Sequence, residues 1–305
     1  MAITSVGTVE DIMEKAFLML NPRSGTREGK LQFFNIVNTL SEKYDLRVHL
    51  TKSTQDIIDT AKEITEQTVI VCGGDGTLSH TLEGLRLAGR EDITVGYLPC
   101  GTANDVASTL GLPKKPVESA KRIISGKPIR QDHGSFNGKS YIYTASFGTF
   151  TKASYETSQD VKNVFGSFAY FMNGLSEILN LQSISAKIEY EDGVINETDI
   201  AFAAIGNTRV IGGGIIKLPP EKALLDDGKL DMLIIRKPKN AIELDKIIKE
   251  IVNGNFDNEF VSIYHSSFFK VNTGEGILWT VDGDAFKAPA EVNIECVKGG
   301  VSFIR

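Results

Sequence analysis

The strongest constraint on the fold is an alternation between short apolar runs and amphipathic segments, which extends from Ala16 to about Gln131. This alternation is typical of parallel strands joined by crossover helices. The apolar runs are nearly continuous, as expected for strands that helices cover on both faces of a sheet. The sequence therefore predicts four strands, at Ala16–Leu20, Leu46–Leu50, Thr68–Cys72 and Thr94–Leu98.

The segments between these strands have the apolar spacing of helices. Three faces are predicted, formed by Phe33, Val37, Leu40 and Tyr44, by Ile57, Ala61 and Ile64, and by Leu78, Leu82 and Leu85. Ser53 and Asp56 precede the second face and fit a capping box, which places the start of a helix there.

After Gln131 the pattern becomes that of an antiparallel β structure. Three dipeptides typical of hairpin turns lie between β-rich runs, namely Asn137-Gly138, Asp192-Gly193 and Gly299-Gly300. Two helical patterns interrupt these runs, at Val161–Leu179 and Ala241–Val252. Because 305 residues exceed one typical domain, we expect an α/β domain over residues 1–132 and a β-rich domain over residues 133–305.

Composition narrows the class of protein. A net charge of −6 argues against general attraction to nucleic acid, so no nucleic-acid partner is expected. The three cysteines have no CxxC spacing, which indicates neither a disulfide framework nor a zinc site. No stretch approaches ~20 continuous apolar residues, and the first 15 residues lack the apolar core of a signal peptide. We therefore expect a cytoplasmic protein.

Three polar turns follow predicted strands, at the edge of the sheet where open α/β folds bind ligands. The first turn is Asn21-Pro22-Arg23-Ser24-Gly25, which alone could be a simple exposed turn. The second is Gly73-Gly74-Asp75-Gly76-Thr77, and it leads directly into a predicted helix. Glycines and the free N–H groups of a helix N-terminus suit a phosphate group.

Asp75 is anomalous in a phosphate-binding turn, because a carboxylate repels phosphates. Two explanations are open: a Mg²⁺ ion lies between the charges, or the side chain caps the turn. We favour the metal, bound directly or through water.

The third turn is Leu98-Pro99-Cys100-Gly101-Thr102-Ala103-Asn104-Asp105. Thr102 can donate a hydroxyl to a phosphate, and Asp105 supplies a second carboxylate, although Asn104 could simply cap a helix. The chain has neither a GxxxxGK[ST] motif nor a spaced GxGxxG motif, which argues against an ordinary P-loop and a Rossmann dinucleotide site.

These three turns together resemble the catalytic domain of the diacylglycerol kinase family, especially the soluble bacterial lipid kinases. The resemblance extends to Asp132, to the segment Leu225–Asp231 and to Val281–Asp284. It implies a nucleotide-binding α/β domain followed by a β-sandwich, with the active site between them. GGDGT alone is shared with NAD kinases, and the third turn separates the two families.

The resemblance also implies roles for individual residues. The residues expected to contact ATP are Asn21, Pro22, Arg23, Ser24, Gly25, Thr51, Gly73, Gly74, Asp75, Gly76, Thr77, Leu78, Ser79, Thr102, Asn104 and Asp105. Asp75, Asp105 and Asp132 would join a magnesium and water network, and Asp75 would be essential for phosphoryl transfer. A second, structural metal would be held by the Asp227 carboxylate and the carbonyls of Leu224 and Lys229, although an Asp-Gly pair also forms a metal-free turn.

Asp284 is the expected catalytic carboxylate, and it departs from the family pattern. The family has DGE where this chain has Asp282-Gly283-Asp284, so the carboxylate lacks one methylene. Three alternatives are open: the cleft closes further, the substrate differs, or the kinase activity is weak or lost. Asp284 could also simply turn the chain. The four histidines, His49, His80, His133 and His265, have no ligand spacing and are interpreted as structural or surface residues.

The expected function is transfer of the γ-phosphate of ATP, with Mg²⁺, to the hydroxyl of diacylglycerol or a related lipid. The lipid would be reached by peripheral contact with the membrane surface, and a homodimer is an open assembly. The alternatives are an NAD-kinase-like phosphotransferase and a nucleotide-binding protein with weak or lost kinase activity.

Overall fold

The computed structural model describes residues 13–24, 32–148 and 183–305. The α/β half contains a parallel sheet in the order β4 (Thr94–Pro99), β3 (Thr68–Gly73), β1 (Glu14–Leu20) and β2 (Tyr44–Leu50). All four predicted strands are confirmed. Because the strands are parallel, the polar turns that follow β1, β3 and β4 lie at the same edge of this sheet.

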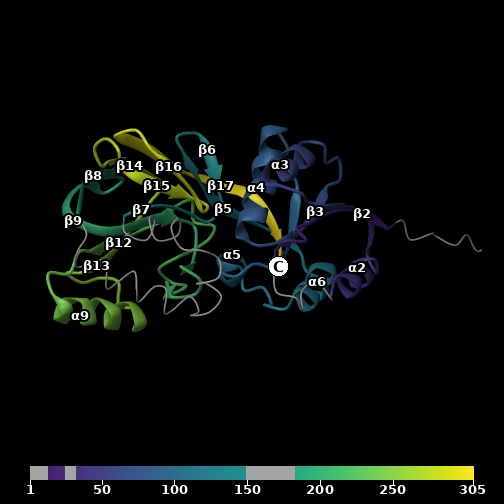
Figure 1. Ribbon diagram of the computed structural model, residues 1–305, viewed down its shortest axis with the longest axis horizontal. Helices are drawn as coiled ribbons and strands as arrows, with labels where there is room; N and C mark the ends of the chain where they lie inside the picture. The colour runs from purple at the N-terminus through teal and green to yellow at the C-terminus, as the bar shows by residue number, and fades with distance from the viewer. Residues whose placement is uncertain (1–12, 25–31, 149–182) are drawn as a thin grey trace, which may run out of the picture.

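Helices cover both faces of the parallel sheet, as its apolar strands require (Figure 1). Their bounds are Phe33–Leu40 (α2), Thr54–Lys62 (α3), Asp75–Leu87 (α4), Asp105–Thr109 (α5) and Pro116–Ser125 (α6). Phe17 and Met19 of β1 face the core shared with α3 and α4, whereas Leu18 and Leu20 face the core shared with α2 and α6.

The predicted helix start at Ser53 is confirmed, whereas one residue was assigned to the wrong element. Ser53 caps α3, because its hydroxyl accepts a hydrogen bond from the Asp56 N–H, and the predicted capping box is thereby confirmed at its serine. Tyr44 was wrongly placed on a helix face. It begins β2, where its side chain is buried against α2, since α2 ends at Leu40.

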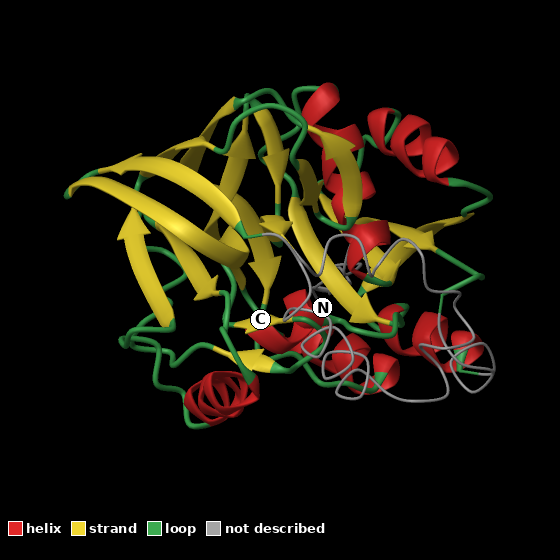
Figure 2. Ribbon diagram, turned by 60° about the vertical axis from the view of Figure 1, so that its left-hand side comes forward, coloured by secondary structure: helices red, strands yellow, loops and turns green. Residues whose placement is uncertain are grey.

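The β-rich half is an antiparallel sandwich-like arrangement, as predicted (Figure 2). Its strands are β5 (Pro128–Phe136), β6 (Lys139–Tyr141), β7 (Thr144–Gly148), β8 (Ile184–Tyr190), β9 (Gly193–Gly206), β12 (Leu230–Arg236), β13 (Val261–Ser266), β14 (Phe268–Asn272), β15 (Leu278–Val281), β16 (Asp284–Lys287) and β17 (Glu291–Ile304), with a small ribbon of β10 (Val210–Ile211) and β11 (Ile216–Lys217). Helix α9 spans Ala241–Val252, as predicted, and buries Ile247 and Ile251. The helix predicted at Val161–Leu179 lies outside the described residues.

Two of the three predicted hairpins are confirmed. Asn137-Gly138 joins β5 to β6, and Asp192-Gly193 forms the turn from β8 into β9, which begins at Gly193. The third prediction was wrong, because Gly299-Gly300 lies inside β17, where the pairing of β17 with β5 shifts register between Val297 and Val301. Gly299 has a positive φ of 58°, which glycine adopts without strain, and the pair therefore makes a β-bulge instead of a turn.

Strand β17 connects the two halves (Figure 1). Its first part pairs with β14, and its last residues, Ser302 and Phe303, pair in parallel with β4. β5 runs antiparallel along β17, and residue 132, at which we expect the domain boundary, falls in the middle of β5. The turns of the α/β half are therefore held against the β-rich half by continuous strands. In the part of the chain that the structure describes, no helix is long and apolar enough to cross a membrane.

Candidate active site

A pocket of about 350 Å³ lies where the strands of the parallel sheet end. Its walls come from the turn after β1, from the segment after β2 that leads into α3, and from the first turns of α4. The lining residues are Asn21, Arg23, Ser24, Thr51, Lys52, Ser53, Thr54, Ile57, Gly74, Gly76, Thr77 and His80. Seven of the residues predicted to contact ATP are among them, from Asn21 to Thr77.

The pocket suits an anion. Its lining includes the cations Arg23 and Lys52, and none of these lining residues is an aspartate or a glutamate. Helix α4 begins at Asp75, so its free N–H groups and the positive end of its dipole lie beside the pocket. These groups together favour a phosphorylated ligand.

The turns are fixed against one another. The Asn21 side-chain amide donates a 2.9 Å hydrogen bond to the Thr77 hydroxyl, which ties the turn after β1 to α4. Gly74 and Gly101 approach so closely that a Cβ atom added to Gly101 would lie 2.6 Å from the Gly74 Cα. Glycine is thus required where the second and third turns meet.

Asp75 points away from the pocket, toward α5. Its carboxylate accepts hydrogen bonds from the Asp105 N–H (2.9 Å), the Val106 N–H (3.2 Å) and the Tyr97 hydroxyl (3.2 Å). Burial, aided by the nearby charge of Asp105, raises the pKa of Asp75 to about 6. The side chain therefore caps α5. The alternative explanation had been that Asp75 caps its own turn, whereas it caps the helix that follows the third turn. Burial makes its ionised state costly.

Asp105 lies beside Asp75 and is 1% exposed. Its Oδ2 atom accepts hydrogen bonds from the Tyr143 hydroxyl (2.6 Å) and the Gly213 N–H (2.8 Å), both from the β-rich half. Its Oδ1 atom is buried and has no hydrogen-bond partner among the described residues. Burial also raises the pKa of Asp105. Gly212–Gly214, whose role the sequence left unassigned, adopt positive φ values and present N–H groups to this carboxylate.

Two buried neighbouring carboxylates with raised pKa values fit a bound cation, because a cation would supply the charge that both lack. The unpartnered Oδ1 of Asp105 is the atom that fits best. The described residues contain no group of three or more His, Cys, Asp or Glu side chains arranged around one metal position. Asp75 and Asp105 could therefore hold Mg²⁺ only together with water or ligand oxygens.

Asp132, the third residue expected in this network, is engaged elsewhere. Its carboxylate accepts 2.6 Å hydrogen bonds from the N–H groups of Gly228 and Gly299. It thus holds the predicted second metal segment against the bulge of β17. A role for Asp132 in metal binding stays a prediction.

Other residues predicted to contact ATP have different surroundings. Leu78 is fully buried in the core beneath α4. The Asn104 side chain bonds to both the N–H and the carbonyl of Gly101 and thereby closes the third turn, with a left-handed φ of 53°. Thr102 is exposed beside Gly101, and Pro22 and Gly73 flank lining residues. Gly25 lies outside the described residues.

Asp282 joins the β-rich half to α4. Its Oδ2 accepts hydrogen bonds from the Ser79 hydroxyl (2.6 Å) and the Ile142 N–H (2.9 Å), and its Oδ1 accepts one from the Tyr143 N–H (2.8 Å). Burial raises the pKa of Asp282 although these donors oppose the shift. With its oxygens occupied, Asp282 is a structural residue of the turn between β15 and β16.

Asp284, the predicted catalytic carboxylate, begins β16, and 64% of its side chain is exposed. Its Oδ2 lies 3.9 Å from the Nε2 atom of His80, which lines the pocket. His80 and Lys52 were not predicted as site residues, because their relevance comes from their position on the pocket wall. His80 is one turn of helix from Thr77, and that spacing was the one available hint.

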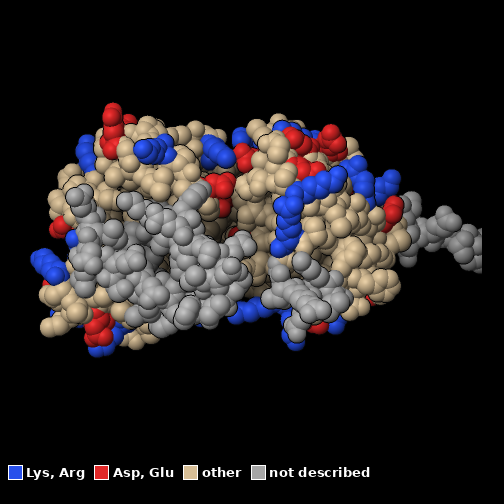
Figure 3. Space-filling model, in the orientation of Figure 1, with Lys and Arg blue, Asp and Glu red and all other residues tan. Residues whose placement is uncertain are grey.

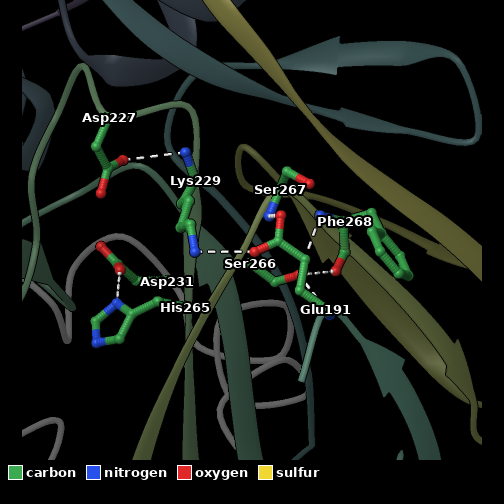
Figure 4. A network of polar contacts seen from close by, with 8 residues as sticks. All are labelled: Glu191, Asp227, Lys229, Asp231, His265, Ser266, Ser267 and Phe268. Carbon is green, nitrogen blue, oxygen red and sulfur yellow. Dashed lines mark hydrogen bonds and ion pairs between the residues drawn. The ribbon is translucent and has the colours of Figure 1, made fainter. Parts of the chain in front are cut away.

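The predicted second metal segment forms a tight turn in the β-rich half (Figure 4). The Asp227 carboxylate accepts a 3.0 Å hydrogen bond from the Lys229 N–H, and the Lys229 ammonium lies 2.8 Å from the Glu191 carboxylate. Leu224 is about half exposed. The turn explains the Asp-Gly sequence without a metal, and metal binding by Asp227, Leu224 and Lys229 stays a prediction.

Two family models match consecutive parts of the chain. The diacylglycerol kinase catalytic domain matches residues 15–136, and the YegS C-terminal NAD kinase beta sandwich-like domain matches residues 145–304. The first match contains the pocket, and the second contains Asp282 and Asp284.

Similar proteins cover nearly the same length. The chain is 29% identical to the diacylglycerol kinase of Bacillus subtilis over 278 residues, which are 89% of this chain and 90% of that protein. It is 30% identical to the diacylglycerol kinase of Staphylococcus saprophyticus over 77% of each chain. A crystal structure of a diacylglycerol kinase from Bacillus anthracis superposes with a TM-score of 0.75 at 24% identity, covering 96% of this chain and 97% of that one, which shows the shared fold.

Proposed function

The chain belongs to the diacylglycerol kinase family of lipid kinases, and from this premise we propose that it transfers the γ-phosphate of ATP to the hydroxyl of diacylglycerol or a related lipid. The observation that carries this proposal is the pocket at the start of α4. Its two cations, its glycines and its hydroxyl groups suit a nucleotide polyphosphate.

Binding and orientation are the main tasks of a protein in phosphoryl transfer. In the proposed complex Arg23 and Lys52 offset the charge of the phosphates, and the N–H groups at the start of α4 donate hydrogen bonds to them. The Asn21 to Thr77 hydrogen bond keeps these groups in place before the nucleotide arrives.

Mg²⁺, when bound, would neutralise charge on the phosphates, and Asp75 and Asp105 are the residues that would hold it, directly or through water. The Oδ1 atom of Asp105, which is buried and has no hydrogen-bond partner in the described part of the chain, suits this purpose. Asp75 also positions α5, so a single side chain connects the metal site to the third turn.

The acceptor hydroxyl would face Asp284, which orients or deprotonates it. Asp284 is exposed beside the pocket, so a lipid could reach it from outside the protein. We propose that the lipid is met at a membrane surface by peripheral contact, because diacylglycerols reside in membranes.

The test is a Mg²⁺-dependent assay of ADP release with four separate acceptors: diacylglycerol, sphingosine, monoacylglycerol and NAD. ATP labelled at the γ-phosphate identifies the phosphorylated product. The proposal expects label in a lipid. Label in NAD would support the NAD-kinase alternative, and ATP binding without transfer to any acceptor would support a nucleotide-binding protein that has lost kinase activity.

A further inference from the structure

His80 lies between two carboxylates at the edge of the pocket. Its Nε2 atom is 3.9 Å from the Asp284 Oδ2, and its Nδ1 atom is 3.8 Å from the Glu83 Oε2. Glu83 is one turn further along α4, whereas Asp284 belongs to β16. The imidazole thus connects the α/β half to the β-rich half where the nucleotide would bind.

The two ring nitrogens have different surroundings. Nδ1 is buried and has no hydrogen-bond partner among the described residues. The charged group that faces it is the Glu83 carboxylate. Both ring nitrogens face a carboxylate, which is only an acceptor, and neither contact is a direct hydrogen bond. The inference uses the tautomer that carries its proton on the buried Nδ1, facing Glu83. That tautomer leaves the lone pair on Nε2, on the side of Asp284.

Glu83 is itself held in position. Its other oxygen, Oε1, lies 3.0 Å from the ammonium of Lys139 in β6. Helix α4 therefore contacts the β-rich half through Glu83 as well as through the bond from Ser79 to Asp282. The 3.8 Å between Nδ1 and the Glu83 carboxylate is too long for a direct hydrogen bond, so Glu83 acts on the imidazole through its charge, which favours the imidazolium form.

The separation of 3.9 Å between His80 Nε2 and Asp284 Oδ2 is too long for a direct hydrogen bond. One oxygen atom at about 2.8 Å from each of them would fit the gap. A hydroxyl group placed there would touch both side chains. Of the two, His80 lines the pocket and Asp284 does not, so His80 is the closer to a bound nucleotide.

Resting on the proposed function, we infer that His80 is a catalytic residue that takes the proton of the acceptor hydroxyl, while Asp284 orients that hydroxyl. The acceptor oxygen forms a bond to the γ-phosphorus, and the bond from that phosphorus to the β,γ-bridging oxygen breaks. ADP leaves with the electron pair of this bond. The hydroxyl proton passes to Nε2, and the imidazolium that results lies between the carboxylates of Glu83 and Asp284.

The experiment compares the full-length parent with three variants. His80→Gln keeps a polar side chain that cannot take the proton, and His80→Gly leaves space for free imidazole. His265→Gln is the matched control, since His265 pairs with Asp231 in the β-rich half (Figure 4) and is not among the residues that line the pocket. Transfer of labelled phosphate to the lipid, ATP affinity and the melting temperature are measured for each.

We expect His80→Gln to lower kcat by about 100-fold or more, the usual contribution of a general base, with ATP affinity within about threefold of the parent. Free imidazole should restore part of the activity of His80→Gly in proportion to its concentration. It should leave the parent and His265→Gln unchanged. A purely structural histidine would show no such rescue.

Near-parent turnover by His80→Gln, or loss of activity in His80→Gly without any rescue, would overturn the inference and leave the proposed function standing. The measurement on the parent distinguishes failure of this inference from failure of the proposed function. If the parent labels no lipid, the proposed function fails and the role of His80 fails with it.

Discussion

Ser79 in α4 donates a 2.6 Å hydrogen bond to Asp282 in the turn between β15 and β16, across the seam between the two halves of the molecule. The two residues are 203 positions apart in the chain. On the face shown in Figure 3, basic and acidic side chains are interspersed over both halves, and the seam between the halves is hollowed. The Ser79 to Asp282 bond therefore adds a polar contact to the strands β5 and β17 that already join the two halves.

Ser79→Ala should lower the free energy of unfolding by about 1–3 kcal/mol, because it leaves a buried carboxylate without one of its donors. Urea unfolding measures this. Ser125→Ala is the matched control, since the Ser125 hydroxyl donates to carbonyls of its own exposed helix turn. Equal losses in the two variants would contradict a special role for the Ser79 to Asp282 bond.

Asp75 should be essential for transfer, as the resemblance implies, and the structure separates its two roles. Asp75→Ala removes both the charge and the cap of α5, so we expect no transfer and a loss of about 1–3 kcal/mol of stability. Asp75→Asn keeps one acceptor oxygen and removes the charge. It should lose transfer with a smaller loss of stability. Lipid phosphorylation by Asp75→Asn at the parent rate would show that the cap is the whole role of Asp75.

His133 should control part of the acid sensitivity of the fold. Burial lowers the pKa of His133 from 6.5 to about 4, so the unfolded chain binds its proton at a higher pH than the folded one. Stability from this group is complete above pH 6.5 and is lost as the pH falls toward 4. The loss is on the order of 3 kcal/mol.

The raised pKa of Asp75 affects stability in the opposite direction. Between pH 3.8 and about 6 the folded state binds more protons than the unfolded chain, so the contribution of Asp75 to stability falls as the pH rises. The measurement is therefore the difference in unfolding free energy between the parent and His133→Gln at several pH values. The parent should lose more stability than the variant below pH 6.5. A constant difference across this range would contradict the burial effect.

The sequence was most informative where local signals decide local structure. Apolar runs predicted the four parallel strands, and these strands bring the turns at Asn21 and Gly73 together at one edge. The turn prediction failed where one dipeptide fits two different structures. Gly299-Gly300 reads as a turn, yet the long pairing of β17 with β5 makes it a bulge.

Long-range contacts were beyond the sequence. The side chain of Asp75 caps a helix that starts 30 residues later, and the free oxygen of Asp105 is visible only once Gly213 and Tyr143 are in place. His80 was interpreted as a structural or surface residue, because Asp284, which lies 3.9 Å from it, belongs to a strand near the C-terminus.

Asp227→Ala tests the predicted second metal. If Asp227 holds a cation together with the carbonyls of Leu224 and Lys229, the variant should melt at a lower temperature and respond less to Mg²⁺ than the parent. If Asp227 only closes its turn, the variant should lose about 1 kcal/mol, the value of one hydrogen bond, and keep the full response. Asp226→Ala removes the same charge from the adjacent exposed residue and is the control. Equal Mg²⁺ responses in both variants would leave only the turn.

The shorter side chain of Asp284 should limit the rate. The 3.9 Å gap to His80 and the mostly exposed position leave room for one more methylene, so Asp284→Glu should keep or raise kcat. Asp284→Asn keeps the size and loses the charge. It should lower kcat by about 100-fold or more, comparable to misplacing a catalytic group by ~1 Å, with ATP affinity preserved. Initial rates of lipid phosphorylation at saturating ATP measure both variants. If Asp284→Asn phosphorylates lipid as fast as the parent, Asp284 takes no part in the reaction, and Asp282, whose oxygens are already hydrogen-bonded, could not replace it without releasing Ser79.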